Sequence, residues 1–102
     1  MPKRLKLNID LNIPITVLLE GDMYVAYTPA FDLSSCGETF EEAEINLRDA
    51  TILFIEECIR MGTLERVLES CGWAIQKRQN KWVPPQIIKH DLMQLPPLAL
   101  AA

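Results

Sequence analysis

The sequence predicts an α+β fold, in which one long helix packs on one face of a mainly antiparallel sheet. Three observations predict it. Short segments with strand-like residue types come first, one long segment with helical periodicity follows, and a shorter helix and a further strand come last. The predicted order is therefore β-β-β-α-α-β. A chain that separates its strands from its helices in this way is typical of α+β domains.

The first third of the chain carries the strand signals. Residues 5–11, LKLNIDL, alternate strictly between apolar and polar side chains, which predicts a strand with one buried face. Residues 15–29 predict a hairpin, because two runs rich in β-branched and aromatic residues flank the turn pair Gly21-Asp22. Residues 31–35, FDLSS, predict a short third arm that returns along the sheet.

A small-residue segment joins this third arm to the long helix. Short polar side chains and a glycine favour turns, so we expect turn residues at Ser34, Ser35, Cys36 and Gly37. Thr39 and Glu42 fit a capping box, in which a hydroxyl and an acid three residues later bond the free N–H groups of the first turn. The helix is predicted to span about 39–61 and to end at Gly62.

Apolar residues recur at three- and four-residue steps along the predicted helix, which predicts one buried stripe. The stripe comprises Phe40, Ala43, Leu47, Ala50, Phe54, Cys58 and Met61. Further apolar positions widen this surface, namely Ile45, Ile52, Ile55 and Ile59. So much apolar circumference predicts a second contact, such as a partner subunit.

The remaining third predicts a shorter helix over about 63–71 and then a strand, a polar turn at 78–81 and a short return. We divide the chain into an α+β domain over 1–83 and a Pro-containing tail over 84–102. The tail has apolar residues but no clear period. Because a free tail would leave them in water, we expect part of it to pack on its own domain or on a neighbour.

Length and charge exclude several function classes. The chain has 102 residues, which is typical of one domain with one core. Its net charge of −4 argues against general nucleic-acid affinity, and the basic group Lys77, Arg78 and Lys81 is interpreted as a solvated hairpin tip. No apolar segment approaches the length of about 20 residues that a membrane span needs. We therefore expect a cytoplasmic protein without membrane contact.

The cysteines predict neither a disulfide framework nor a metal site. There are three, widely spaced, and the chain has one histidine, so paired CxxC ligands are missing. Zinc binding would require Cys36, Cys58, Cys71 and His90 to converge in the fold. Inert thiols are the favoured interpretation.

Catalytic residues are likewise not predicted. Cys36 and His90 form the thiol–imidazole pair available for nucleophilic catalysis, but nothing in the sequence places them together. A two-metal nuclease needs clustered carboxylates, whereas Asp10 is expected on the polar side of its strand, and Glu44 and Asp49 lie on different helix faces. We expect a protein that is no enzyme and holds no metal or cofactor. A vestigial nuclease is the least favoured alternative.

Residues 18–57 resemble the HicB-like domain. The motif of that family comprises a strand that ends in Gly, a strand that contains Tyr, a Pro-centred segment, and then Gly-x-Thr-x-x-Glu-Ala-x-x-Asn-x-x-x-Ala. The matching residues are Gly21, Tyr24, Ala26, Pro29, Gly37, Thr39, Glu42, Ala43, Asn46 and Ala50. Most of these positions are interpreted as structural.

The resemblance implies a degraded RNase H-like fold and a role as antitoxin in a type II toxin–antitoxin system. Such antitoxins bind and neutralise a small basic HicA-type toxin that cleaves RNA, and they form dimers or larger assemblies. Many members also carry a C-terminal DNA-binding module. Here the segment after Trp82 contains four prolines and no helical period long enough for a DNA-reading helix, so DNA binding is doubtful.

A surface that binds a basic toxin is expected to be acidic, because opposite potentials speed encounter and select the partner. The candidate contact residues are Tyr24, Tyr27, Asp32, Glu38, Glu41 and Glu42. The alternative function is an orphan HicB-like homodimer with a structural or regulatory role and no toxin partner. Self-association is expected in either case, because the long helix and the tail are widely apolar.

Overall fold

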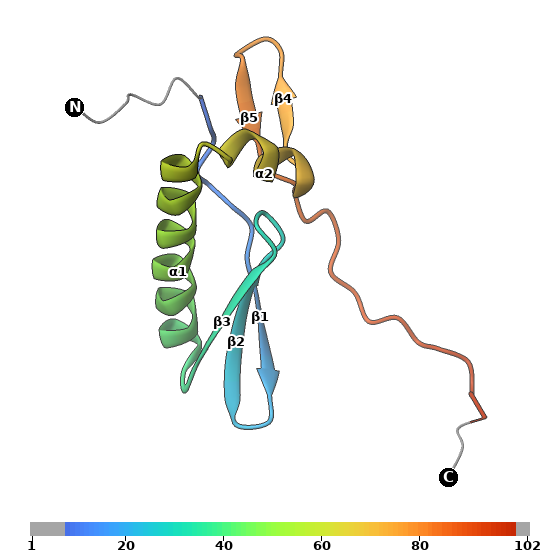
Figure 1. Ribbon diagram of the computed structural model, residues 1–102. Coiled ribbons are helices and arrows are strands. Elements are labelled where there is room, and N and C mark those ends of the chain that lie inside the picture. The colour runs from blue at the N-terminus through green and yellow to red at the C-terminus, as the bar shows by residue number, and fades with distance from the viewer. Residues whose placement is uncertain (1–7, 100–102) are drawn as a thin grey trace.

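The computed structural model describes residues 8–99 and confirms the predicted α+β fold (Figure 1). Three antiparallel strands form one sheet in the order β1-β2-β3, and a second, two-stranded sheet follows later in the chain. The long helix α1 packs on β2 and β3. The elements are β1 (Thr16–Glu20), β2 (Met23–Thr28), β3 (Leu33–Gly37), α1 (Phe40–Met61), α2 (Leu64–Ser70), β4 (Ala74–Gln76) and β5 (Lys81–Val83).

The predicted hairpin is confirmed as β1 and β2. The two strands pair from Thr16 opposite Tyr27 to Glu20 opposite Met23, so the loop holds two residues. Gly21, the first of them, has a φ of 60°. A positive φ at the first loop position is what a type II′ turn requires, and glycine adopts it without steric cost.

The third strand lies two residues later than predicted. It spans Leu33–Gly37 and pairs along its whole length with β2, so the turn assignment for Ser34, Ser35, Cys36 and Gly37 was wrong. The reversal occurs earlier, where the Ala30 N–H donates to Thr28 Oγ1 at 3.1 Å and Asp32 adopts a φ of 53°. Asp tolerates this left-handed conformation better than most residues, because its short polar side chain bonds locally.

Gly37 serves close packing rather than chain reversal. A Cβ atom at this position would lie 2.6 Å from the Ala43 backbone nitrogen and 2.9 Å from the Glu42 carbonyl carbon. Both atoms belong to the first turns of α1, so the helix rests directly on the end of β3. A glycine is therefore required by contact between two backbones.

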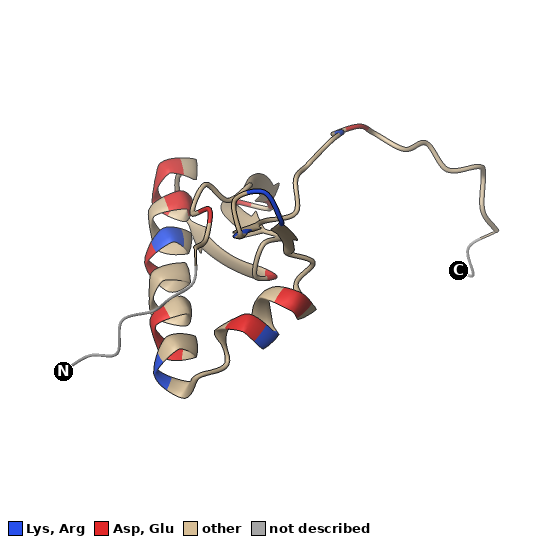
Figure 2. Ribbon diagram, turned by 90° about the horizontal axis from the view of Figure 1, so that it is seen from above, with Lys and Arg blue, Asp and Glu red and all other residues tan. Residues whose placement is uncertain are grey.

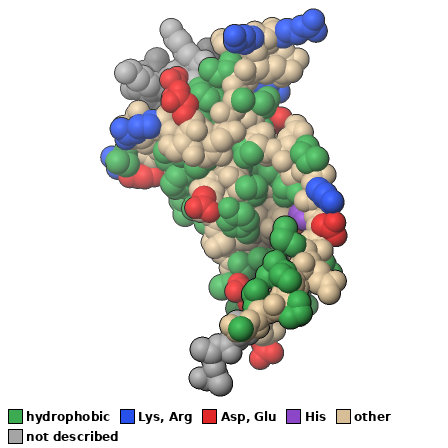
Figure 3. All heavy atoms as spheres, turned by 90° about the vertical axis from the view of Figure 1, so that its right-hand side faces the viewer, with side chains coloured by type: hydrophobic (Ala, Val, Ile, Leu, Met, Phe, Trp, Pro, Cys, Tyr) green, Lys and Arg blue, Asp and Glu red, His purple; other side chains and the backbone are tan. Residues whose placement is uncertain are grey.

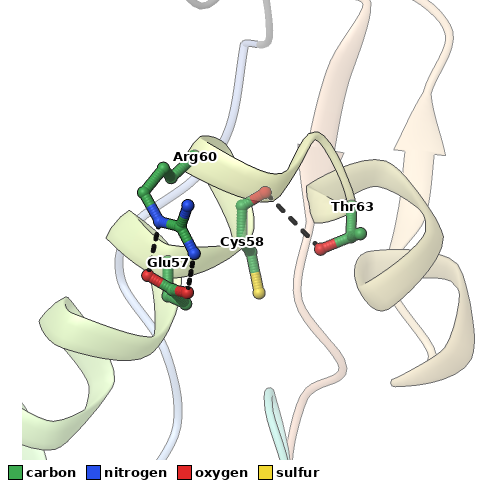
Figure 4. Close-up of polar contacts among 4 residues, drawn as sticks. All are labelled: Glu57, Cys58, Arg60 and Thr63. Atoms are coloured by element: carbon green, nitrogen blue, oxygen red, sulfur yellow. Dashed lines mark hydrogen bonds and ion pairs between the residues drawn. The ribbon is translucent and has the colours of Figure 1, made fainter.

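The ends of α1 follow the predicted signals. Thr39 is extended, and its hydroxyl accepts a hydrogen bond from the Glu42 N–H at 3.1 Å, which is the N-cap arrangement. Gly62 has a φ of 70°, and the Thr63 N–H donates to the Cys58 carbonyl at 2.9 Å, which closes the helix as a Schellman motif. The Thr63 hydroxyl also donates to the Cys58 carbonyl, at 3.5 Å (Figure 4). Glu57 and Arg60 form an ion pair at the exposed surface of the last turns.

The buried stripe of α1 is shorter than predicted. Ala43, Leu47 and Cys58 are buried, whereas Phe40 and Met61 are 50% and 60% exposed. The helix has 22 residues and is about 33 Å long, while strands of five or six residues reach only about 17–20 Å. The C-terminal end of α1 therefore extends past the sheet (Figure 1), whereas Phe40, at its start, packs edge-on against Tyr24 of β2 with half of its side chain exposed. The prediction that both terminal side chains are buried was wrong.

The main core lies between α1, α2 and the loop before β3, and consists largely of aromatic and aliphatic side chains. Leu68 is fully buried, and the rings of Phe31 and Trp73 lie 5.4 Å apart. The Trp73 indole N–H donates to the Ala30 carbonyl at 2.6 Å. This bond satisfies the polar end of a buried tryptophan and ties the segment after α2 to the loop between β2 and β3.

The strands β4 and β5 form the second sheet, which also holds the N-terminal segment. The Trp82 N–H donates to the Asn8 carbonyl at 2.8 Å, and the Asp10 N–H donates to the Trp82 carbonyl at 2.9 Å. Ile9 therefore bridges Trp82 in parallel. The predicted strand over 5–11 lies partly outside the described residues; within them it appears as this single bridge.

The tail packs only at its start. Pro84 is buried and Ile87 is half-buried, but residues 88–99 are exposed and run away from the domain (Figure 1). The radius of gyration is 17.1 Å, against about 13 Å for a compact domain of this length. No helix within residues 8–99 is long and apolar enough to cross a membrane.

Candidate protein-binding surface

Three of the predicted contact residues lie together at the start of α1. Glu38, Glu41 and Glu42 are all exposed there, and Figure 2 shows acidic residues along this helix. Acidic side chains in the first turn interact favourably with the positive end of the helix dipole. The three side chains are therefore accessible at the surface, Glu38 just before the helix and Glu41 and Glu42 in its first turn.

Tyr24 lies beside this acidic group. It pairs with Gly37 across β2 and β3, and its ring meets that of Phe40 edge-on, with centroids 6.3 Å apart. It is half-buried and packs on the cluster of Ala26, Ala43 and Leu47. Tyr24 therefore combines a structural role with a partly accessible aromatic edge next to acids.

Tyr27 and Asp32 lie on the other face of the sheet. Residues three apart in a strand point to opposite faces, so Tyr27 faces away from Tyr24 and from α1. Its hydroxyl donates to Asp32 Oδ1 at 2.9 Å. This hydrogen bond raises the pKa of Tyr27, with smaller contributions from desolvation and from the Asp32 charge. The six predicted residues thus form two separate groups.

An apolar groove of about 490 Å³ was not predicted as such. Its walls are the segment before β1 and one side of α1. The apolar lining comprises Leu11, Ile13, Ile15, Ile45, Leu47, Ile52 and Ile55, with Thr51, Glu41, Glu44 and Arg48 beside them. The wide apolar circumference of α1 indicated one wall. The other wall could not be inferred, because nothing local places residues 11–15 beside the helix.

Hydrophobic side chains are also exposed on β1 and on the tail. Val17, Leu18 and Leu19 are 36%, 54% and 63% exposed, and Leu92 is 96% exposed. Figure 3 shows hydrophobic side chains along the tail and over the side of the molecule that lies away from α1. These apolar surfaces, together with the groove, are the features that a protein partner would cover.

The three cysteines and the histidine lie in different parts of the fold. Cys36 is exposed on β3, and His90 lies in the extended tail. Cys58 is buried, and burial raises the pKa of the half-buried Cys71, which lowers the fraction of reactive thiolate. No group of three or more His, Cys, Asp or Glu suited to a metal ion occurs in the described part of the chain.

The carboxylate of Asp10 has a local structural role. Its Oδ1 accepts hydrogen bonds from the Asn12 N–H at 3.0 Å and from Asn12 Nδ2 at 3.1 Å. The backbone hydrogen bond is the main cause that lowers the pKa of Asp10. This arrangement is an Asx turn, which explains the residue without any metal chemistry.

Comparison with known proteins finds no match to this chain among family models, curated proteins or solved structures. The resemblance to the HicB-like domain therefore rests on the motif residues of the sequence itself.

Proposed function

We propose that the protein is a non-catalytic HicB-like antitoxin that binds and neutralises a small, basic, RNA-cleaving toxin of the HicA type. The observation that carries the proposal is the convergence of the motif residues in one corner of the fold. Gly37, Thr39, Ala43 and Asn46 all lie where β3 meets α1, and each has a distinct structural role there.

The roles are interdependent. Ala43 is fully buried, and its backbone nitrogen lies so close to Gly37 that a Cβ at Gly37 would be 2.6 Å from it. Asn46 Nδ2 donates to the Cys36 carbonyl at 2.9 Å, and the Thr39 hydroxyl caps the helix that carries both Ala43 and Asn46. Motif residues that depend on one another support a specific match, since composition alone would not place them in contact.

The charge distribution also supports this function. Glu38, Glu41 and Glu42 are exposed beside the partly accessible Tyr24, and the chain has a net charge of −4. A toxin that binds RNA is basic, so opposite potentials would speed the encounter of the two proteins. Aromatic side chains such as Tyr24 are common anchors of interfaces.

Growth rescue tests the proposal. The full chain is co-expressed with the product of a small, Lys/Arg-rich reading frame adjacent to its gene. We expect the toxin alone to arrest growth and the pair to grow and to co-purify. Failure of both rescue and co-purification contradicts the proposal.

A matched pair of variants tests the proposed surface. Glu38→Lys with Glu41→Lys should abolish rescue, whereas Glu65→Lys with Glu69→Lys should preserve it. Both pairs change the net charge equally and involve exposed residues, and Glu41 and Glu65 each lie in the first turn of a helix. Equal rescue by both pairs would contradict binding at the start of α1.

A second candidate function is an orphan HicB-like homodimer with a structural or regulatory role. The apolar groove and the exposed apolar side chains of β1 favour it, because a second copy could cover them without any toxin. A basic reading frame adjacent to the gene, whose product arrests growth, would count against this alternative.

A further inference from the structure

The outer edge of β1 has no strand beside it in the part of the chain that the structure describes. Within residues 8–99, β1 pairs only with β2 and forms one edge of the three-stranded sheet. The other edge, on β3, is covered by α1. Open edges with exposed apolar residues are templates for pairing with another strand.

The two faces of β1 are both apolar. Val17 and Leu19 lie opposite Ala26 and Tyr24 and share the face that carries α1, whereas Leu18 points to the other face. All three side chains are exposed. A helix or a loop placed against one face would leave the other untouched, whereas a strand added at the edge places cross-strand side chains beside those of β1 on both faces.

The direction of the free backbone groups follows from the hairpin. In a hairpin with a two-residue loop, the pair that flanks the loop is hydrogen-bonded, and pairs alternate from there. Glu20, Leu18 and Thr16 therefore bond to β2. The N–H and C=O groups of Val17 and Leu19 point outward and are available to a new strand.

We propose that β1 pairs antiparallel with β1 of a second copy, with Leu18 on the two-fold axis. In this register Val17 lies opposite Leu19 of the other copy, and both have outward-pointing N–H and C=O groups, so the two residues exchange their hydrogen bonds. Leu18 then lies opposite Leu18 as a non-hydrogen-bonded pair. The strand is thus complementary to itself in backbone polarity and in side-chain type.

The charges agree with this register. Glu20 lies opposite Thr16 of the other copy rather than opposite a second glutamate, so no like charges face each other. The apolar tail is a poorer occupant of the same edge. Between Pro85 and Pro96, every five-residue strand of the tail would include at least one of Lys89, His90 and Asp91 beside the apolar β1.

The dimer would contain one sheet of six strands, three from each copy. A two-fold axis through an antiparallel pair runs perpendicular to the sheet, so both α1 helices lie on the same face. This dimer does not depend on the antitoxin role, and it forms with or without a toxin.

Disulfide cross-linking tests the register. Because Cys36 is exposed, the experiment uses the full chain with Cys36→Ser. Leu18→Cys in this background places two identical residues opposite each other, with Cα atoms about 4.5 Å apart, within the range of a disulfide. Mild oxidation should convert most of the protein to a covalent dimer.

Leu19→Cys in the same background is the matched control. Leu19 is slightly more exposed than Leu18, but its nearest identical residue is diagonal to it, about 7–8 Å away, so cross-linking should be at least tenfold slower. Faster cross-linking through Leu19, or equal rates for both variants, overturns the proposed register.

Light scattering tests the assembly itself. The natural chain should have the mass of a dimer, and Leu18→Lys, which places two like charges opposite each other at the axis, should give a monomer with an unchanged circular dichroism spectrum. A natural chain that is monomeric at all concentrations overturns the proposal, and so does a Leu18→Lys variant that remains dimeric. Either result leaves toxin binding to be judged separately by growth rescue.

Discussion

The two edges of the sheet differ in how their backbone groups are covered. At β3, α1 lies against the strand, Gly37 allows backbone contact, and Asn46 donates to the outward carbonyl of Cys36. At β1, the outward groups of Val17 and Leu19 have no strand beside them within residues 8–99. The described part of the chain covers one edge by itself, and our proposal assigns the other edge to a second copy.

The largest expected difference between the two edges is in the stability cost of a leucine-to-alanine substitution, made once in α1, which covers β3, and once in β1. Leu47→Ala should lower the free energy of unfolding by about 3 kcal/mol, because Leu47 is 2% exposed on the side of α1 that packs on the sheet, and its truncation leaves a cavity. Leu19→Ala on β1 should change it by less than about 0.5 kcal/mol, since the side chain is exposed.

Urea denaturation of both variants measures the difference. The protein concentration must be low enough for the chain to be monomeric, because a dimer would add stability through β1. Equal losses for the two variants would mean that β1 is covered within the monomer, and the comparison of edges would fail.

Gly37→Ala tests the close approach of α1 to β3. The added Cβ would meet backbone atoms at 2.6 Å and 2.9 Å, so helix and strand must separate, at a cost of about 2–3 kcal/mol. Ser34→Ala, at an exposed position of the same strand, is the control and should cost less than about 0.5 kcal/mol. A Gly37→Ala variant as stable as the control in thermal unfolding would show that the helix is not held at this distance.

Asn46→Ala tests whether the Asn46 side chain stabilises the outer edge of β3 by its hydrogen bond to the backbone. The variant loses the hydrogen bond to the Cys36 carbonyl, which should cost about 1 kcal/mol. It should also speed hydrogen exchange of the amides of β3, because the covered edge opens more readily. Asp49→Ala, at an exposed position of the same helix, should leave the exchange of β3 unchanged, and equal effects of both variants would reject the role of Asn46.

The smallest expected effect concerns the face of the sheet away from α1, and it depends on pH. The hydrogen bond to Asp32 raises the pKa of Tyr27 in the folded state, so this contribution is fully present below the ordinary tyrosine pKa of about 10. It is lost as the pH rises through the folded value, since the unfolded chain releases the proton first.

Ultraviolet absorbance measures this titration directly. The chain has two tyrosines, and one of them should ionise at a higher pH than a free tyrosine. Asp32→Asn keeps a side chain that tolerates the φ of 53° at this position and removes the charge, so the late titration should move toward the ordinary range. An unchanged profile in this variant would exclude Asp32 as the cause.

The hairpin and both ends of α1 could be predicted from the sequence, because their signals are local. Gly21 adopts a positive φ within a two-residue loop, the Thr39 hydroxyl bonds an N–H three residues later, and Gly62 ends the helix. The position of β3 could not be predicted. A glycine at position 37 suggests a turn when the sequence alone is considered. In the fold, a glycine is needed there because the backbone of Ala43 lies too close for a Cβ atom.

The binding surface could be predicted only in part for the same reason. The acids at the start of α1 follow from the helix signals, but Tyr24 and Tyr27 were grouped although their spacing in a strand places them on opposite faces. The apolar groove forms because residues 11–15 lie beside α1. The N-terminal segment joins the second sheet because Ile9 bridges Trp82. Contacts between such distant segments leave no periodic signal.

Direct binding of toxin to the purified full chain tests the central claim, which is that this protein acts by binding another protein. A small, Lys/Arg-rich toxin of the HicA type is titrated into the chain by calorimetry at low and at physiological salt. We predict a saturable complex that weakens as salt rises, and at least tenfold weaker binding for Glu38→Lys with Glu41→Lys than for Glu65→Lys with Glu69→Lys. No heat of binding, together with separate elution of the two proteins in gel filtration, would contradict the account.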